Sequence, residues 1–286
     1  MDKREKQEYV KLLDVLYRVM QALEGEPLDA DRRYYDAEGL VTKFFMHAAS
    51  ALYLYRGTII TDLLPPPGIN FGDVASVPVV VRAAIEAFLT FHYVFIAPSC
   101  DEEREFRYLS WKAGGFADRQ RFPILSAKGE RVLDDDRRLL DELHNELQSN
   151  PVFQELRSKE QTKILKGRWR RHSWKQIGRA AGLAGAYAET MYEVLSGYAH
   201  SSSLSVLQIK QADTREKQRE LMEAPMGTVK IAMANVIDGY CALFPKAKEA
   251  LLAAPEGKAL AEIWLDVGRR DLECIDEADD TPEGKV

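Results

Sequence analysis

The segment from Val77 to Ala97 constrains the fold of this chain most, because it is almost continuously apolar. Its length and composition suit a helix that is enclosed on all sides, either in a membrane or in a protein core. Arg82, Glu86 and His92 interrupt it, and a central Arg alone costs about 2.5–3.5 kcal/mol on membrane-insertion scales. The segment is therefore predicted to be a buried core helix whose polar side chains need partners inside the protein.

Helical periodicity continues through most of the chain, with Pro and Gly separating the segments. The predicted helices cover 5–24, 34–63, 77–96, 101–120, 130–148, 152–166, 174–200 (as a pair joined near 182–185), 215–244 and 256–275. Ser76 is predicted to be the N-cap of the apolar helix. Only Leu204–Ile209 alternates weakly like a strand, and no second candidate stands out to pair with it. The expected fold class is all-α, a bundle of about eight to ten helices with little or no sheet.

Composition and charge narrow the class of protein. A net charge of −6 argues against a globally basic nucleic-acid binder and gives no reason to expect attraction to anionic membranes. Cys100, Cys241 and Cys274 lie far apart and form no disulfide framework. The charged N-terminus lacks the apolar region of a signal peptide. A cytoplasmic location is expected, with one helical domain over 1–276 and a flexible acidic tail at 277–286.

A stripe of hydrogen-bonding side chains marks the late apolar region. Tyr192, Ser196 and His200 are spaced four apart, which places them along one face of a helix. Arg82 and Glu86 repeat this spacing in the early apolar helix, and the stripe could supply the partners that the charged pair needs. In the functional interpretation, Arg82, Tyr192 and Ser196 bind an anionic ligand, while His200 and Glu86 are candidate catalytic residues. The alternative is a buried network that specifies helix register.

Cations alternate with aromatic residues in the basic link, residues 168–175. Arg168, Arg170, Arg171 and Trp174 are possible nucleic-acid contacts, because guanidinium groups hold phosphates and aromatic rings stack on bases. The following residues, 173–183, resemble the first helix and turn of a helix-turn-helix motif, although the next helix is apolar on most sides. The alternative is a solvated loop that two tryptophans anchor.

Other patterns that carry chemistry are weak or missing in the sequence. The spacing from Arg138 to His144 is that of HEPN-type ribonucleases, which are helical bundles, but the surrounding residues are acidic. No G-x-S-x-G elbow supports a serine hydrolase. The five histidines show no metal-ligand spacing, and no phosphate-binding or dinucleotide motif indicates a cofactor. If the protein is an enzyme, a metal-independent hydrolase or HEPN-like ribonuclease is expected.

Four short motifs resemble those of a bacterial family of helical proteins, a domain of unknown function. They are the R-x3-E pair Arg82–Glu86, the aromatic run Phe88–Phe95, Trp174 with the short helix that follows it, and the Y-x3-S-x3-H segment Tyr192–His200. The resemblance covers roughly residues 40–210 and implies an all-helical fold in which these polar residues belong together. It supplies no established activity. The helical extension at 212–276 lies outside it and could form a homodimer surface.

These observations lead to two functional hypotheses. In the first, an internal polar site binds an anionic small molecule or RNA, as an enzyme acting on nucleotides or RNA or as a sensor in stress or phage defence. In the second, the protein is a non-enzymatic structural or interaction protein. The second predicts that removing Arg82 or Glu86 unfolds the protein, because breaking a buried pair costs about 3–5 kcal/mol.

Overall fold

The computed structural model describes residues 3–25, 32–60, 69–183 and 185–279. Within them lie thirteen α-helices, one π-helical turn and a short two-stranded sheet, which confirms the all-α fold class and slightly exceeds the eight to ten helices expected. The chain divides into two compact units, residues 1–92 with 177–286 and residues 93–176, and each is described by itself. The single domain expected over 1–276 stays a prediction.

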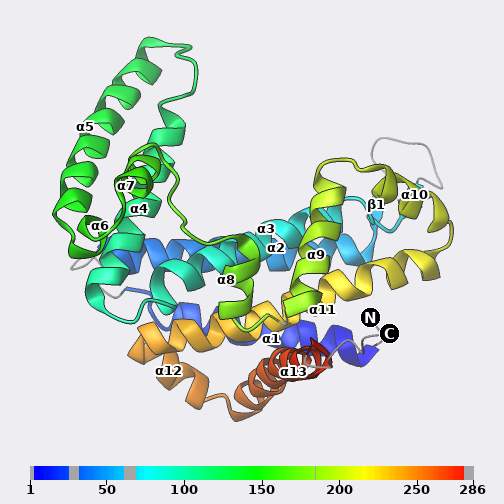
Figure 1. The fold of residues 1–286 in the computed structure, drawn as a ribbon. Coiled ribbons are helices and arrows are strands. Elements are labelled where there is room, and N and C mark those ends of the chain that lie inside the picture. Colours follow the sequence, from blue (N-terminus) through cyan, green and yellow to red (C-terminus); the bar gives the residue numbers. More distant parts are fainter. Residues whose placement is uncertain (1–2, 26–31, 61–68, 184, 280–286) are drawn as a thin grey trace, which may run out of the picture. The chain divides into compact units, whose positions relative to one another are not determined.

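The first unit is organised around α3 (Ser76–Phe91), which packs against α2, α9 and α11 (Figure 1). α11 also contacts α1, α12 and α13. The helices of this unit, besides α3, are α1 (Lys3–Gln21), α2 (Arg32–Arg56), α9 (Gly185–Ala199), α10 (Ser203–Gln211), α11 (Arg215–Leu243), α12 (Pro245–Leu252) and α13 (Pro255–Asp279), and α8 (Trp174–Ala180) crosses from the second unit. Residues 280–286 of the predicted acidic tail lie outside the described residues.

The predicted core helix is found where the sequence places it. Val81, Ile85 and Phe88 are buried, as are most of their neighbours on α3. In the described part of the chain, the segment Ser76–Ile96 is the one helix long and apolar enough to span a membrane, and 61% of its most apolar window is buried within the protein. Burial against α2, α9 and α11 is the role expected of a core helix.

The second unit is a smaller helical assembly. α4 packs against α5, and the two short helices after α5 also contact α4. Arg119 near the end of α4 forms an ion pair with the buried carboxylate of Asp136 on α5, 2.6 Å between Nε and Oδ2. The helices that lie wholly within this unit are α4 (Asp101–Arg119), α5 (Ala127–Ser149), α6 (Pro151–Gln154) and α7 (Ser158–Leu165).

The helix expected over 34–63 ends earlier than predicted. α2 stops at Arg56, Gly57 follows at φ +102°, and β1 (Thr58–Ile60) pairs antiparallel with β2 (Ile69–Phe71). The side chain of Arg215 occupies the space into which a side chain at position 57 would project. Glycine tolerates both the positive φ and the close approach, so the helix ends here although apolar residues continue.

The start of α3 also differs from the prediction. Ser76 is the first helical residue, and Ala75 occupies the N-cap position. The carboxylate of Asp73 accepts a hydrogen bond from the amide of Ser76, at 2.9 Å, which is the role expected of an N-cap side chain. At its other end, the helix continues beyond Phe91 as the π-helical turn His92–Ile96, so the predicted end near Ile96 is confirmed.

Three further segments have helix boundaries that the apolar pattern did not predict. The helix predicted over 152–166 is divided into α6 and α7, because the backbone is extended at Arg157 between them. Pro245 begins a further helix, α12, before α13. The weak strand expected at Leu204–Ile209 is wrong, since these residues lie within α10. The side chain of Ser202 caps α10 by accepting a hydrogen bond from the amide of Ser205, at 3.2 Å, and this cap stabilises the start of the helix.

Candidate functional site

α3 presents Arg82 and Glu86 together on one side of the core helix. The Nε of Arg82 donates to Oε1 of Glu86 at 3.1 Å, one helical turn away. The two side chains are 20% and 35% exposed, while Val81 and Ile85 beside them are buried. The pair therefore lies at the edge of the core, where solvent or a solute can reach it. The buried-network interpretation expected these charges to be desolvated.

α9 brings Tyr192 and His200 to the same place from the other side. Tyr192 is half-buried within α9, and His200 follows the last helical residue, Ala199. The phenol of Tyr192 donates to Oε1 of Glu86 at 2.8 Å and accepts from Nη2 of Arg82 at 3.3 Å. We call Arg82, Glu86, Tyr192 and His200 the Arg82 cluster. The convergence expected from the two i,i+4 patterns is found for these four residues.

A Schellman motif at the end of α9 positions His200. The amide of Ser202 donates to the carbonyl of Gly197 at 2.9 Å, and that of Ser201 donates to the carbonyl of Tyr198 at 3.3 Å. Ser201 takes the left-handed conformation, at φ +53°, where glycine is usual because other residues are strained. His200 is thus the C-cap residue, exposed at the point where the chain leaves the helix.

His200 contacts the cluster through its ring. Nη1 of Arg82 lies 3.2 Å from Nε2 of His200. Because a guanidinium can only donate, Nε2 is the acceptor and the ring proton is on Nδ1. The guanidinium also lies 5.3 Å from the centre of the Tyr192 ring, within the range of a cation–π contact. Arg82 therefore engages the other three members at once.

Burial and hydrogen bonding shift two pKa values in the cluster. Burial raises the pKa of Tyr192, and the hydrogen bond to the Glu86 carboxylate raises it further. Burial lowers the pKa of Arg82, but the hydrogen bond to Tyr192 and the charge of Glu86 outweigh it, so the pKa is raised. Tyr192 thus stays a neutral phenol and Arg82 a cation throughout the ordinary pH range.

The predicted stripe includes Ser196, which in the described structure does not join the cluster through its hydroxyl, and omits Thr90, which does contact Glu86. Ser196 is half-buried, and its carbonyl accepts the amide of His200 at 3.0 Å. Among the described residues, the hydrogen bonds of the cluster do not include the Ser196 hydroxyl. Thr90, which the predicted stripe does not include, donates from its hydroxyl to the carbonyl of Glu86 at 2.7 Å. An i,i+4 search around Glu86 that included hydroxyl side chains would have found it.

The basic link lies in the second unit, and several of its cationic and aromatic residues contact one another or other residues of that unit. The guanidinium of Arg170 lies 4.4 Å from the centre of the Trp174 ring, and Trp169 packs edge-on against Trp174 at 5.9 Å. The backbone amide of Arg171 donates to the phenol of Tyr93 at 3.3 Å. Arg168 and Arg171 are exposed. The two tryptophans thus anchor the loop, and Trp174 already has a guanidinium over its ring.

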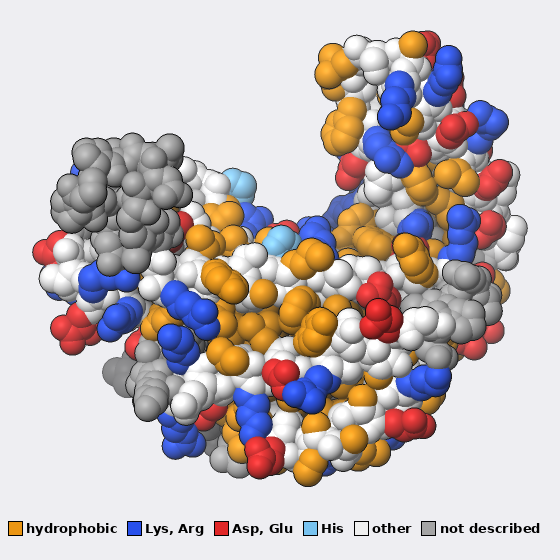
Figure 2. All heavy atoms as spheres, turned by 180° about the vertical axis from the view of Figure 1, so that it is seen from behind, with side chains coloured by type: hydrophobic (Ala, Val, Ile, Leu, Met, Phe, Trp, Pro, Cys, Tyr) orange, Lys and Arg blue, Asp and Glu red, His pale blue; other side chains and the backbone are white. Residues whose placement is uncertain are grey.

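The molecular surface shows acidic and basic side chains intermixed. On the face drawn in Figure 2, Lys and Arg side chains alternate with Asp and Glu and do not form one continuous basic field. This pattern agrees with the net charge of −6. A nucleic acid bound on this face would have to rely on local contacts, because broad electrostatic attraction needs a patch of one sign.

The Arg138–His144 spacing does not form a paired site. Arg138 is exposed and donates to Asp135 at 2.6 Å. His144 is half-buried, and its Nε2 is enclosed without a hydrogen-bond partner. Burial lowers the pKa of His144. Positions six apart on α5 are turned about 120° from each other around the helix axis, so the two side chains do not share one face of the helix.

Comparison with known proteins places the chain in a family. No curated protein and no solved structure matches it. The sequence model of one protein family covers residues 67–217, which include α3, α9 and every member of the Arg82 cluster, and leave most of α11 and all of α12 and α13 outside. The family resemblance expected from the R-x3-E and Y-x3-S-x3-H motifs is thereby confirmed at the level of the family. The chain belongs to a family of unknown function, DUF5677.

Proposed function

We propose that the Arg82 cluster binds an anionic group, a phosphate or a carboxylate. The observation that carries this proposal is a guanidinium that three side chains hold in one orientation while 20% of the side chain stays exposed beside an exposed histidine. A guanidinium held in this way loses little conformational freedom when an anion binds. Charge-assisted hydrogen bonds from such a group are about twice as strong as neutral ones.

The donors that remain match the acceptors of a phosphate. Three of the five N–H groups of Arg82 are directed to Glu86, Tyr192 and His200 within the described structure. The other two, with the Nδ1–H of His200, can donate to an incoming oxyanion. A phosphate offers several oxygens, so a nucleotide or the backbone of RNA is the ligand class that we infer. His200 would be the proton-transfer or hydrogen-bonding residue if a reaction takes place.

Glu86 holds its neighbours in position and also reduces the net positive charge of the cluster. Its carboxylate fixes Arg82 and Tyr192 and also neutralises most of the local positive charge. Binding should therefore be modest in affinity and should depend on hydrogen-bond geometry more than on long-range attraction. This behaviour suits a sensor of a small anion as well as an enzyme. A cytoplasmic location and a role in stress or phage defence stay predictions from the sequence.

The test compares wild type, Arg82→Lys and His200→Ala on inorganic phosphate, nucleoside monophosphates and a mixed RNA panel. Calorimetry and melting curves detect binding, and gel assays detect cleavage. Arg138→Gln is the matched control, because this exposed Arg lies outside the cluster. We expect wild type and the control to bind alike. Arg82→Lys should bind at least about ten-fold more weakly, since Lys loses the planar fork.

The same experiment separates the classes of function. Cleavage by wild type that is lost in His200→Ala at equal stability indicates an enzyme. A ligand that raises the melting temperature without turnover indicates a sensor. Failure of wild type to bind any of these anions would contradict the proposal, and strong destabilisation by one further variant, Arg82→Ala, would then support the structural network.

A further inference from the structure

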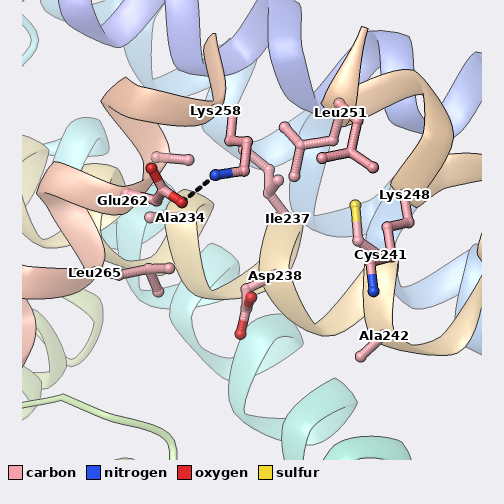
Figure 3. A pocket seen from close by; sticks show the side chains of 12 residues that line it. Ala234, Ile237, Asp238, Cys241, Ala242, Lys248, Leu251, Lys258, Glu262 and Leu265 are labelled. Carbon is pink, nitrogen blue, oxygen red and sulfur yellow. Dashed lines mark hydrogen bonds and ion pairs between the residues drawn. The ribbon is translucent and has the colours of Figure 1, made fainter. Parts of the chain in front are cut away.

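A half-open cavity lies between the three C-terminal helices of the first unit. Its volume is about 220 Å³, and its walls come from α11, α12 and α13 (Figure 3). The lining begins at Ala234, beyond the residues that match the family model, and includes no member of the Arg82 cluster. The cavity is therefore a second place in this chain where a small molecule could bind.

The inner wall of the cavity is apolar. Ala234, Ile237 and Ala261 are buried and line it, and Leu251 and Leu265 also contribute side chains. Such a wall favours an aliphatic or thioether group, because burying apolar surface contributes about 25 cal/mol per Å². Apart from the weakly polar thiol of Cys241, the buried residues that line it offer no side chain that would hydrogen-bond to the buried part of a ligand.

The rim of the cavity carries both signs of charge. Lys258 and Glu262 form an ion pair with each other on α13. Asp238 on α11 and Lys248 on α12 are exposed, and Figure 3 draws no ion pair between them. Within the described structure, this leaves one carboxylate and one ammonium at the mouth that are not engaged in a salt bridge.

Asp238 and Lys248 line the cavity together with Cys241. Burial and, to a smaller extent, the carboxylate of Asp238 raise the pKa of the Cys241 thiol, the ammonium of Lys248 lowers it, and the net result is a pKa of about 12. Both charged side chains thus lie at the cavity that Cys241 lines, where the ammonium and the carboxylate of one small ligand can meet them.

We propose that this cavity binds a free apolar α-amino acid, with the ammonium of the ligand on Asp238, its carboxylate on Lys248, and its side chain against the apolar wall. The volume agrees with this class of ligand. If about 150 Å³ holds benzene, 220 Å³ accommodates about nine non-hydrogen atoms, the size of leucine or methionine. The proposal is independent of the anion site at Arg82.

The test titrates L-leucine, L-methionine and L-phenylalanine into the full-length protein by calorimetry. Isovalerate and isoamylamine, which keep the leucine side chain but lack the ammonium or the carboxylate, are the comparison ligands. We expect L-leucine or L-methionine to bind at least about ten-fold more tightly than either. Asp238→Asn and Lys248→Gln should each weaken amino-acid binding about ten-fold, while Asp266→Asn and Lys246→Gln, which change similar residues outside the cavity, should not.

Thiol labelling gives a second readout of amino-acid binding, one that does not depend on the heat measured by calorimetry. Saturating L-leucine should slow modification of Cys241 by a small disulfide reagent and leave the exposed Cys100 unchanged, measured on peptides by mass spectrometry. Ala242→Phe, at the exposed mouth, should block binding without altering the inner wall. The proposal is overturned if no apolar amino acid binds wild type, or if isovalerate and isoamylamine bind as tightly as leucine. It is also overturned if neither rim variant weakens binding.

Discussion

Arg82 donates a hydrogen bond to His200, with 3.2 Å between Nη1 and Nε2, and this contact joins α3 to the end of α9, both within the residues that match the family model. The bond requires a neutral imidazole, because a protonated ring has no acceptor and would place two cations side by side. His200 is therefore held as the Nδ1–H tautomer while the cluster is intact. Because His200 is an exposed residue, its Nδ1–H is the group that can meet a ligand.

Replacing His200 should weaken anion binding while changing the free energy of unfolding only slightly. Its side chain is exposed, and exposed polar pairs contribute about 0–1 kcal/mol. We expect His200→Ala to lower the free energy of unfolding by less than about 1 kcal/mol, measured by urea denaturation, while weakening phosphate binding. A loss above about 2 kcal/mol would indicate that the histidine is part of a structural network.

Removing the charge of Glu86 should strengthen anion binding. Glu86→Gln keeps an oxygen that can accept from Arg82 and Tyr192 but no longer neutralises the guanidinium. We expect phosphate or nucleotide affinity to rise by about two- to ten-fold, measured by calorimetry at low salt. Glu103→Gln, which changes a similar i,i+4 pair with Arg107 in the second unit, is the control. Equal or weaker binding by Glu86→Gln would argue against an anion ligand.

The left-handed residue after His200 should be a site of strain. Ser201 has φ +53°, and this conformation costs about 1–2 kcal/mol for a residue other than glycine. Ser201→Gly should therefore stabilise the protein by about 0.5–1 kcal/mol after the entropy of glycine is subtracted. Ser202→Ala, which removes the N-cap of α10, should instead destabilise it by about 1 kcal/mol. Melting curves of both variants test the assigned helix end, and a destabilised Ser201→Gly would contradict it.

Acid should destabilise the folded chain through its partly buried histidines. Burial lowers the pKa of His47 in the folded state, with a further contribution from the charge of Lys43, and its Nε2 is enclosed without a partner. The folded state thus disfavours the protonated ring, so the stabilising contribution is present above the unfolded pKa of about 6.5 and is lost as the pH falls through the folded pKa. Between about pH 7.5 and pH 5.5, we expect the melting temperature of wild type to fall more than that of His47→Gln. Parallel curves would exclude His47 as a source of the acid sensitivity.

Much of the fold could be predicted because the sequence carries strong periodic signals. The apolar helix with Arg82 and Glu86 is found as expected, and Tyr192 and His200 meet it because positions four apart share a helix face. Local spacing thus located both halves of the Arg82 cluster, and the need to pair a charge at the edge of a core predicted that they meet.

What could not be predicted depends on backbone geometry and on contacts between distant segments. The end of α2 at Gly57 follows from a positive φ and from the approach of Arg215, which periodicity does not report. The position of His200 depends on a Schellman motif with serine where glycine is usual. Whether the Arg82–Glu86 pair is sealed or open depends on how α9 packs against α3, and only the structure shows side chains that are partly exposed.

The most direct test of the anion site is the response of the His200 ring to phosphate. Long-range nitrogen–proton NMR spectra of the five histidines, assigned with His200→Gln, report the tautomer and environment of each ring. We expect His200 to be the Nδ1–H tautomer, and its signals to shift on addition of phosphate or a nucleoside monophosphate while those of His47 and His144 stay in place. An Nε2–H tautomer, or His200 signals that saturating anion leaves unchanged, would contradict the proposed site.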